Sequence, residues 1–282
     1  MDPSISRTTW RALEPYHAMA YFAPEPQGEY AAVGLDNQQN RAAGYFPARA
    51  AAMGAVSPGV VQATFFNFSP LAVAVGMAGA WDKTSPGELS AARYRGADRA
   101  LRRLCGDQLE STATAEAADL ARSACEACTP YGRPLYGANA GLDWPEEPHM
   151  VLWHAITLLR EYRGDGHIAA LVTDGFTGLE SAVTHVAQGD LWKKDALRTT
   201  RGYSEEEWQA CVQDQQQRGL LDQDEQFTDQ GRARRQHVED ATDRLALPPW
   251  ERLGEAACER LRKAVAPLVK AIADGGGFPL SR

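Results

Sequence analysis

One group of residues in this 282-residue chain has the side chains that acid–base chemistry requires. His154 and Glu161 are seven residues apart, so they share a face of a helix. His167 follows Gly164 by three residues, and a hairpin of two helices at Gly164 would bring the three side chains together. An imidazole beside a carboxylate is the usual general acid–base pair, because the carboxylate fixes the imidazole tautomer. Arg160 would then serve as an anchor for an anion.

This group also has a purely structural interpretation. Arg160, Glu161, Arg163 and Asp165 would form a salt-bridge network between helices, and His167 would satisfy a helix end. The glycines on both sides of Asp165 suit a tight turn. From the residues alone we favour this structural interpretation over the catalytic one.

A second group lies nearer the N-terminus and pairs His17, a candidate acid–base residue, with Tyr21. The two are four residues apart and share a helix face. Glu25 follows in a turn bounded by prolines and is the matching carboxylate. Arg49 suits bidentate binding of an anion. We expect Tyr21 and Arg49 to contact a ligand.

Aromatic residues surround this second group in the sequence. Asn67 stands between Phe66 and Phe68, where an amide needs a hydrogen bond or the polar floor of a pocket. Phe66, Asn67 and Trp81 are therefore further candidates for ligand binding, since many aromatic and few polar groups are typical of small-molecule pockets. A helical core with buried Arg–Glu pairs explains the pattern equally well. We expect any pocket to lie between the two groups.

Neither a cofactor nor a metal is expected. Cys125 and Cys128 form a lone CxxC on an expected helix, and two buried cysteines explain it better than zinc. His149 and His154 are five residues apart, which is a poor spacing for a helical ligand pair. No Walker, GxGxxG or GxSxG motif occurs.

Composition indicates a cytoplasmic protein without a membrane segment. Five cysteines are too few, and odd in number, for a disulfide framework. The start of the chain has no apolar core of a signal peptide, and the longest apolar run, residues 71–81, is too short to span a bilayer. A net charge of −8 lacks the basic surplus of typical nucleic-acid binders.

The patterns that must position these residues are helical, and they predict a mainly α protein. An N-terminal helical domain is expected over residues 1–148. Ser57-Pro58, Ser69-Pro70 and Ser85-Pro86 each place a capping serine before a proline at the first helical position. A strong helix over 150–163 is expected to end at Gly164, after an irregular stretch over 131–148.

A C-terminal winged-helix domain with a final helix is expected over residues 149–282. Thr177 caps one helix, and Ser204 with Glu207 forms a capping box at the start of another. Residues 220–228 predict a small β-hairpin wing, and a long helix follows it.

The C-terminal half resembles MarR-like winged helices in "RGYSEEEW" and "GLLDQDEQFTDQGR". Nearly all of residues 10–260 resemble an actinobacterial family of helix-turn-helix, or MarR-like, proteins. The resemblance implies an all-α N-terminal region fused to a winged helix, and it implies no settled activity. The motifs that carry it are Glu14-Pro15-Tyr16-His17, Tyr21-Phe22-Ala23-Pro24-Glu25, Gly44-Tyr45-Phe46, Arg49-Ala50-Ala51, Phe66-Asn67-Phe68-Ser69-Pro70, Leu152-Trp153-His154, Arg160-Glu161 and Gly164-Asp165-Gly166-His167.

The charges of the expected recognition helix argue against DNA. A winged helix places its third helix in the major groove and basic wing residues on phosphates. Here the third helix, residues 204–218, has Arg218 as its one basic residue against Glu205, Glu206, Glu207 and Asp214, and the wing tip has Asp222, Asp224 and Glu225. Basic residues outside the helix form at most a separate strip; they are Lys193, Lys194, Arg198, Arg201, Arg232, Arg234 and Arg235. We therefore do not expect a nucleic-acid partner.

These observations lead to one functional expectation and two alternatives. The first is a small-molecule-binding protein, acting as a hydrolase-like acid–base enzyme on a specialised metabolite. The first alternative is a MarR-like, ligand-responsive transcriptional regulator. The second is a non-catalytic sequestration or interaction protein. A homodimer is expected, and for the interaction protein we expect it to form through the terminal helices.

Overall fold

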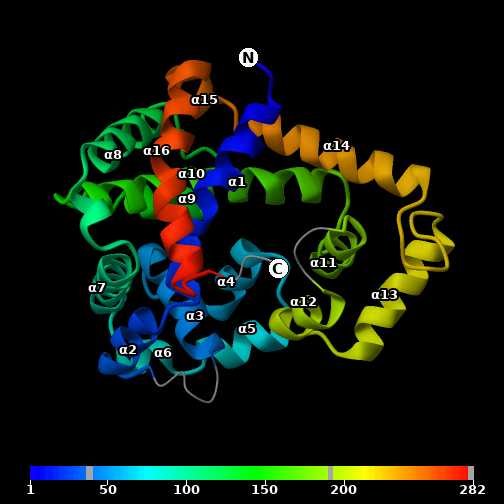
Figure 1. Ribbon diagram of the computed structural model, residues 1–282. Helices are drawn as coiled ribbons and strands as arrows, with labels where there is room; N and C mark the ends of the chain where they lie inside the picture. Colours follow the sequence, from blue (N-terminus) through cyan, green and yellow to red (C-terminus); the bar gives the residue numbers. More distant parts are fainter. Residues whose placement is uncertain (36–40, 190–192, 279–282) are drawn as a thin grey trace.

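The computed structural model describes residues 1–35, 41–189 and 193–278, and these residues are mainly α-helical (Figure 1). The helices of the N-terminal half are α1 (Ser4–Ala18), α2 (Pro24–Ala32), α3 (Ala42–Ala50), α4 (Pro58–Phe65), α5 (Pro70–Met77), α6 (Ala80–Lys83), α7 (Pro86–Cys105), α8 (Thr112–Cys125) and α9 (Pro134–Ala140). Short 3₁₀ turns follow α1, α3 and α7 at Met19–Tyr21, Ala51–Met53 and Gly106–Glu110. No helix of the described residues has the length and apolar character needed to cross a membrane.

The three Ser–Pro starts are confirmed at α4, α5 and α7. Each proline occupies the first helical position, and each serine before it is extended. The Ser69 and Ser85 hydroxyls accept the expected backbone hydrogen bonds, whereas the Ser57 side chain makes no cap bond. These helices therefore begin where local chemistry places them.

Helix α10 (Pro148–Thr173) is the central helix, and it corrects the expected stop at Gly164. The helix continues through Gly164 and Gly166, neither of which has a positive φ. Asp165 lies inside this helix and not in a tight turn, and its carboxylate accepts a hydrogen bond of 2.9 Å from the Tyr136 backbone N–H. Packing of α10 against α1, α8, α9 and α14 overrides the local glycine signal. The predicted hairpin that would join His154, Glu161 and His167 is therefore wrong.

The two glycines of α10 have different roles, which a pair of substitutions separates. A Cβ on Gly164 would lie 3.6 Å from the nearest atom, whereas one on Gly166 would lie 2.7 Å from the Arg133 guanidinium. That guanidinium donates to the carbonyl groups of Tyr162 and Leu245. We expect Gly164→Ala to raise the free energy of unfolding by about 0.5–1 kcal/mol. We expect Gly166→Ala to lower it by about 1 kcal/mol, through lost hydrogen bonds. Urea unfolding followed by circular dichroism measures both, and equal effects would contradict this assignment.

The C-terminal half consists of α11 (Gly178–Ala187), α12 (Lys194–Arg201), α13 (Glu205–Gln217), α14 (Asp229–Leu245), α15 (Pro248–Leu253) and α16 (Glu255–Asp274). The caps at Thr177 and Ser204 are confirmed, and each forms a complete capping box with the glutamate three residues later. Helix α15 had no sequence prediction, and α9 lies within the stretch expected to be irregular.

The expected β-hairpin wing is not supported by the structure. Between α13 and α14, a single antiparallel bridge pairs Leu221 with Phe227, and the described residues contain no β-strand. The Asp222 carboxylate accepts the backbone N–H groups of Asp224 and Gln226, and Glu225 has a positive φ of 59°. This tight turn closes the segment after one residue pair.

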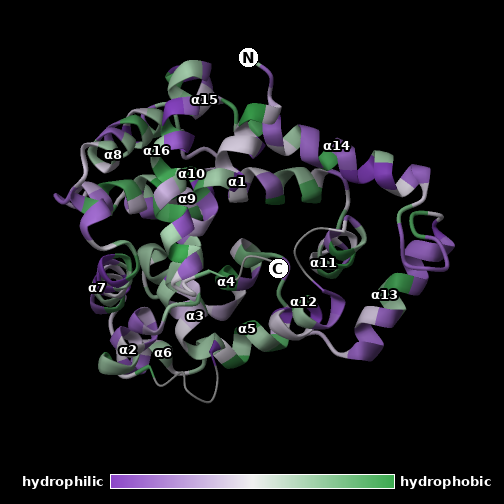
Figure 2. Ribbon diagram, viewed as in Figure 1, coloured by the Kyte–Doolittle hydropathy of each residue, from purple (hydrophilic) through white to green (hydrophobic). Residues whose placement is uncertain are grey.

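The main hydrophobic core takes residues from both ends of the chain. Its buried side chains come from α1, α7, α8, α10, α15 and α16, and include Leu13, Leu101, Trp153, Trp250 and Leu261. The boundary expected at 148/149 coincides with the start of α10, and this core includes residues on both sides of it. Figure 2 shows hydrophilic residues along most of α14, and its packing against α10 brings charged residues into the interior.

A loop of the N-terminal half also meets the C-terminal half at α11 and α12. Residues 66–69, here called the 66–69 loop, connect α4 to α5, and the Ser69 N–H donates to the Arg201 carbonyl over 2.8 Å. A Cβ on Gly178 would lie 2.1 Å from the Phe66 carbonyl oxygen, so the backbones are in direct contact there. The helices α12 and α5 accordingly lie side by side in Figure 1.

Candidate functional site

The structure brings together five predicted site residues from three segments of the chain. His17 and Tyr21 come from the end of α1 and the turn after it, Arg49 from α3, and Arg160 and Glu161 from α10. We call these five residues the junction cluster. It joins members of both sequence groups, which were expected to flank one pocket.

His17 occupies the buried side of the junction cluster and is fully enclosed. Its Nδ1 lies 2.9 Å from the Thr157 hydroxyl, and its Nε2 lies 2.8 Å from the Tyr21 hydroxyl. Its ring stacks on Trp153 at 5.4 Å between centroids. Burial, with the nearby guanidinium groups of the cluster, holds the pKa of His17 well below its ordinary value. His17 is therefore a neutral imidazole, and its Nε2 can orient the Tyr21 hydroxyl.

Glu161 is the carboxylate of the cluster and is 4% exposed. The Arg49 guanidinium donates to both of its oxygens over 3.0 and 3.1 Å, and Arg160 donates to one of them over 2.9 Å. Burial alone would raise the pKa of Glu161, but the attraction of Arg49, Arg160 and Arg93 lowers it overall. The carboxylate is thus ionised and is held by two arginines.

Three partners of the cluster escaped prediction from the sequence. Glu14 accepts hydrogen bonds from Arg160 over 3.0 and 3.1 Å, and Tyr45 accepts one from Arg49 over 2.7 Å. Thr157 holds the second nitrogen of His17. Tyr45 lies four residues before Arg49, and Thr157 lies four residues before Glu161. Helical spacing could therefore have placed each of them beside a residue of the cluster. Glu14 was visible only as part of a family motif.

His154 lies on the other side of Trp153 from the junction cluster. Its Nδ1 is 2.5 Å from the Tyr94 hydroxyl, and its ring meets Trp144 edge-on at 4.5 Å. Burial, with Arg93 and Arg122, lowers the pKa of His154 to about 4. The Nε2 is buried without a hydrogen-bond partner. His154 belongs to an aromatic core layer and does not face Glu161.

His167 lies further along α10, against α14. Its Nδ1 is 2.8 Å from the Thr242 hydroxyl. Burial, followed by the positive charge of Arg235, lowers the pKa of His167 to about 3. Around it, Arg163 and Arg235 pair with Asp243 and Glu239 in a buried network. The buried ion pairs of Arg163 agree with the structural interpretation, but His167 lies inside α10 and satisfies no helix end, and no ion pair of Asp165 is found among the described residues.

The lowered pKa values of these buried histidines predict that the folded protein loses stability in acid. Between pH 6.5 and about 3, His167 is neutral in the folded state and protonated in the unfolded state. The unfolded state therefore binds more protons in this range, and the free energy of unfolding falls as the pH falls. From pH 7 to 5 this costs about 2 kcal/mol for one histidine. Urea unfolding is measured at pH 7 and at pH 5. The stability lost between the two pH values should be smaller in His167→Asn than in the wild type by about this amount. The control His237→Asn changes an exposed histidine and should keep the wild-type loss; the same loss in both variants would refute the prediction.

The remaining predicted residues lie outside the junction cluster. Glu25 pairs with Arg103 at the surface, and hydrogen bonds from Arg103 lower the pKa of Glu25. Trp81 packs between two hydrophobic clusters, and its indole donates to the Val56 carbonyl over 2.9 Å. Phe66 and Asn67 are half-buried in the 66–69 loop.

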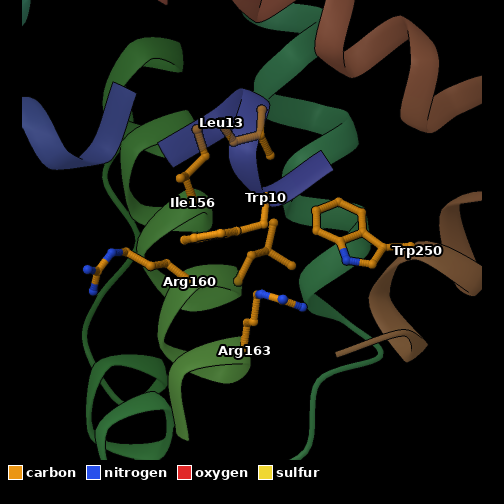
Figure 3. Close-up of a pocket in the computed structure, with 7 residues that line it drawn as sticks. Trp10, Leu13, Ile156, Arg160, Arg163 and Trp250 are labelled. Atoms are coloured by element: carbon orange, nitrogen blue, oxygen red, sulfur yellow. The ribbon is translucent and has the colours of Figure 1, made fainter. Parts of the chain in front are cut away.

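A small enclosed pocket lies beside the cluster, between α1, α10 and α15 (Figure 3). Its volume is about 10 Å³, which holds about one water molecule. The residues around it are Trp10, Leu13, Ile156, Leu159, Arg160, Arg163 and Trp250. An organic ligand would therefore have to displace side chains at this position.

The α11–α13 unit is a compact set of three helices with its own core. Leu197 of α12 and Trp208 and Val212 of α13 pack with residues of α11 and of the segment after α13. Helices α12 and α13 are joined by a short turn in which Gly202 has a φ of 76° and Ser204 caps α13. Two helices joined by such a turn form the arrangement of a helix-turn-helix.

Comparison with known families agrees with this geometry. A family model described as a helix-turn-helix family matches residues 6–279. This chain belongs to the helix-turn-helix family. No curated protein and no solved structure matches the chain.

In this helix-turn-helix protein, the outer face of α13 is acidic. Glu205, Glu206, Glu207 and Asp214 are exposed on it, and Arg218 is engaged by Asp214 and Glu180. The repulsion of a phosphate backbone by these carboxylates follows from their charge.

Most of the basic residues that were candidates for a separate DNA face already have partners within the chain. Lys194 pairs with Glu225 over 3.0 Å and Arg198 with Glu205 over 2.9 Å. Arg234 and Arg235 pair with Asp174 and Glu239, and Arg201 lies over the Phe68 ring. Lys193 is exposed and Arg232 bonds weakly to a backbone carbonyl.

Proposed function

We propose that this helix-turn-helix protein binds a small molecule at the junction cluster and does not use α13 to read DNA. The observation that carries the proposal is the convergence of His17, Tyr21, Arg49, Arg160 and Glu161 from separate helices. Ligand sites typically combine a small number of precisely placed polar groups with surrounding aromatic side chains. The Arg49 guanidinium lies 4.4 Å from the Phe65 ring and 5.4 Å from the Tyr45 ring.

Stability alone gives little reason for such a cluster. A buried ion pair costs desolvation energy, and its replacement by apolar residues is often neutral or stabilising. Arg49 is 9% exposed and Glu161 is 4% exposed, so this pair bears most of that cost. A role in ligand recognition accounts for the retention of charges that packing does not require.

The acid–base form of this proposal rests on the 2.8 Å contact between His17 Nε2 and the Tyr21 hydroxyl. A neutral imidazole beside a phenol can accept the phenol proton as the phenol oxygen attacks an acyl carbon of the substrate, and can then return that proton to the leaving group. Tyr21 would be the group that touches the substrate, and His17 would assist it. Turnover of a bound metabolite, abolished in Tyr21→Phe with binding kept, would distinguish an enzyme from a binding protein.

Ligand binding is tested by retention of metabolites. Purified protein is incubated with a small-molecule extract, washed by ultrafiltration and denatured, and the released compounds are identified by mass spectrometry. We expect a compound retained by the wild type to be reduced at least about tenfold in Arg49→Lys, because lysine cannot reproduce the bidentate geometry. The control Arg103→Gln alters a surface pair and should retain it. Equal retention by all three proteins would contradict the junction cluster as the site.

A ligand-responsive regulator of the MarR-like kind is the second candidate, and the family match over residues 6–279 favours it. The acidic surface of α13 argues against this candidate, because it would repel DNA. We expect gel shifts with genomic DNA fragments to show no specific duplex binding at physiological salt. Specific binding that survives physiological salt would overturn the proposed use of the α11–α13 unit and favour the regulator.

A further inference from the structure

We infer that the ligand of the junction cluster is an organic carboxylate, and that Arg201 from the α11–α13 unit completes its binding site. This inference rests on the proposed function and names the chemistry of the ligand. It follows from a surplus of positive charge on buried and half-buried arginines and from the place where that surplus lies.

Four arginines and two carboxylates surround Tyr21 and Tyr45. Arg49 and Arg160 share Glu161, and Arg160 also binds Glu14. Arg93 is 4% exposed and lies 4.9 Å from the Trp153 ring, and no described carboxylate is within ion-pair distance of it. Arg201 is the fourth arginine. Buried charge of one sign is costly unless an opposite charge joins it, so this region is suited to an added anion.

Like Arg93, Arg201 is poorly satisfied by the described residues. Its Nε is buried without an acceptor, and its side-chain hydrogen bond is a long contact of 3.5 Å to the Thr200 hydroxyl. No carboxylate of the described residues pairs with it. Burial lowers the pKa of Arg201, and the positive charges of Arg49 and Arg160 lower it further. The Arg201 guanidinium thus lies in an electrostatic field that an anion would relieve.

The position of Arg201 is fixed by a continuous set of aromatic contacts. Its guanidinium lies 4.5 Å from the Phe68 ring, Phe68 lies 5.6 Å from Tyr45, and Arg49 lies 5.4 Å from Tyr45. Arg201 and Arg49 therefore approach the same aromatic pair from the two halves of the chain. A carboxylate between them would receive planar guanidinium donors from both.

The 66–69 loop beside these residues shows the features of a binding segment. Phe66 has a φ of 43°, an unfavourable conformation for a bulky residue that is typically kept at functional sites. The half-buried Asn67 amide has no hydrogen bond to the described residues. The loop thus supplies a free amide and strained backbone next to the arginine that lacks a partner.

The aromatic surroundings favour an organic carboxylate over an inorganic ion. Tyr45, Phe65 and Phe68 present ring faces and edges to the arginines, and these pack well against the apolar body of an organic acid. Inorganic phosphate has no apolar part to contact these rings. The site is also interior, which excludes a polyanion such as DNA.

The test uses sodium benzoate as an organic carboxylate, benzamide as its neutral isostere and sodium phosphate as the inorganic anion. Thermal unfolding is followed by circular dichroism, with sodium chloride added to match ionic strength. We expect benzoate to raise the Tm of the wild type by about 2 °C or more, and benzamide and phosphate to leave it unchanged. Arg201→Gln should lose the benzoate effect. The control Arg198→Gln removes a neighbouring arginine that already pairs with Glu205, and it should keep the effect.

A second measurement does not depend on the choice of acid. Without ligand, Arg201→Gln should leave the Tm unchanged or raise it, because it removes a half-buried charge that has no carboxylate partner among the described residues. A lower Tm in this variant would show that Arg201 is a structural residue and would overturn the inference.

The other outcomes are also decisive. Equal stabilisation by benzoate and benzamide, kept in Arg201→Gln, would leave a small-molecule site but reject an anionic ligand. Stabilisation by phosphate alone would reject the organic carboxylate. A benzoate effect no larger than that of sodium chloride would overturn the inference, while metabolite retention that depends on Arg49 would still support the proposed function.

Discussion

Glu161→Gln is expected to lower the free energy of unfolding by about 3–5 kcal/mol, the usual cost of removing one partner from a buried ion pair. Glu161 is the carboxylate that neutralises Arg49, and within the described residues Arg49 has no other ion-pair partner. The substitution keeps the shape of the side chain and removes its charge, so Arg49 remains buried and uncompensated. Urea unfolding followed by tryptophan fluorescence measures the difference.

The matched control is Glu25→Gln, which removes a carboxylate from another Arg–Glu pair. Arg103, its partner, has a side chain that is 44% exposed, and a pair at the surface contributes about 0–1 kcal/mol. Losses of similar size for both variants would mean that the junction cluster is solvated, which would also weaken its role in ligand binding.

Gly178→Ala is expected to separate the 66–69 loop from the α11–α13 unit. An alanine Cβ would lie 2.1 Å from the Phe66 carbonyl oxygen, so the backbones must move apart. We expect a stability loss of about 1–3 kcal/mol or more, in the range of other overpacked sites. Hydrogen exchange of the Ser69 amide, which donates to the Arg201 carbonyl, should become faster.

Gly87→Ala is the matched control for this effect. Gly87 also lies in the first turn of a capped helix, but no atom lies within 4 Å of its potential Cβ. This variant should keep or slightly raise stability, because alanine favours helices over glycine. Unchanged Ser69 exchange in Gly178→Ala would contradict the direct backbone contact.

The parts of the fold that were predictable from sequence depend on interactions within a few residues. Ser69-Pro70, Ser85-Pro86, Thr177 and Ser204 each satisfy a free backbone N–H or set a backbone angle locally, and their helices begin as expected. Gly164 is a local stop signal as well, but packing on several sides of α10 outweighs it. The wing failed for a similar reason, because the Asp222 side chain closes a tight turn that the strand pattern does not show.

The candidate site was predictable in its composition but only partly in its arrangement. Spacing placed His17 beside Tyr21, and the sequence suggested an anionic partner for Arg49 without indicating that this partner is Glu161. Spacing could not show that Glu161 faces Arg49 while His154 faces Tyr94, because this depends on where α3 and α7 pack on α10. Arg201 entered as a surface charge, and its burial depends on contact between distant segments.

The pairing of α1 with α16 has a consequence for synthesis of the protein. Leu13 and Tyr16 of the first helix share one core with Leu261 and Val265 of the last, and α1 also packs on α14. During synthesis, the apolar face of α1 lacks these partners until the residues of α14 and α16 have been made. Contacts this far apart in the chain form slowly and leave apolar surface exposed meanwhile. The core around α1 can therefore form completely only after the residues of α16 have been synthesised.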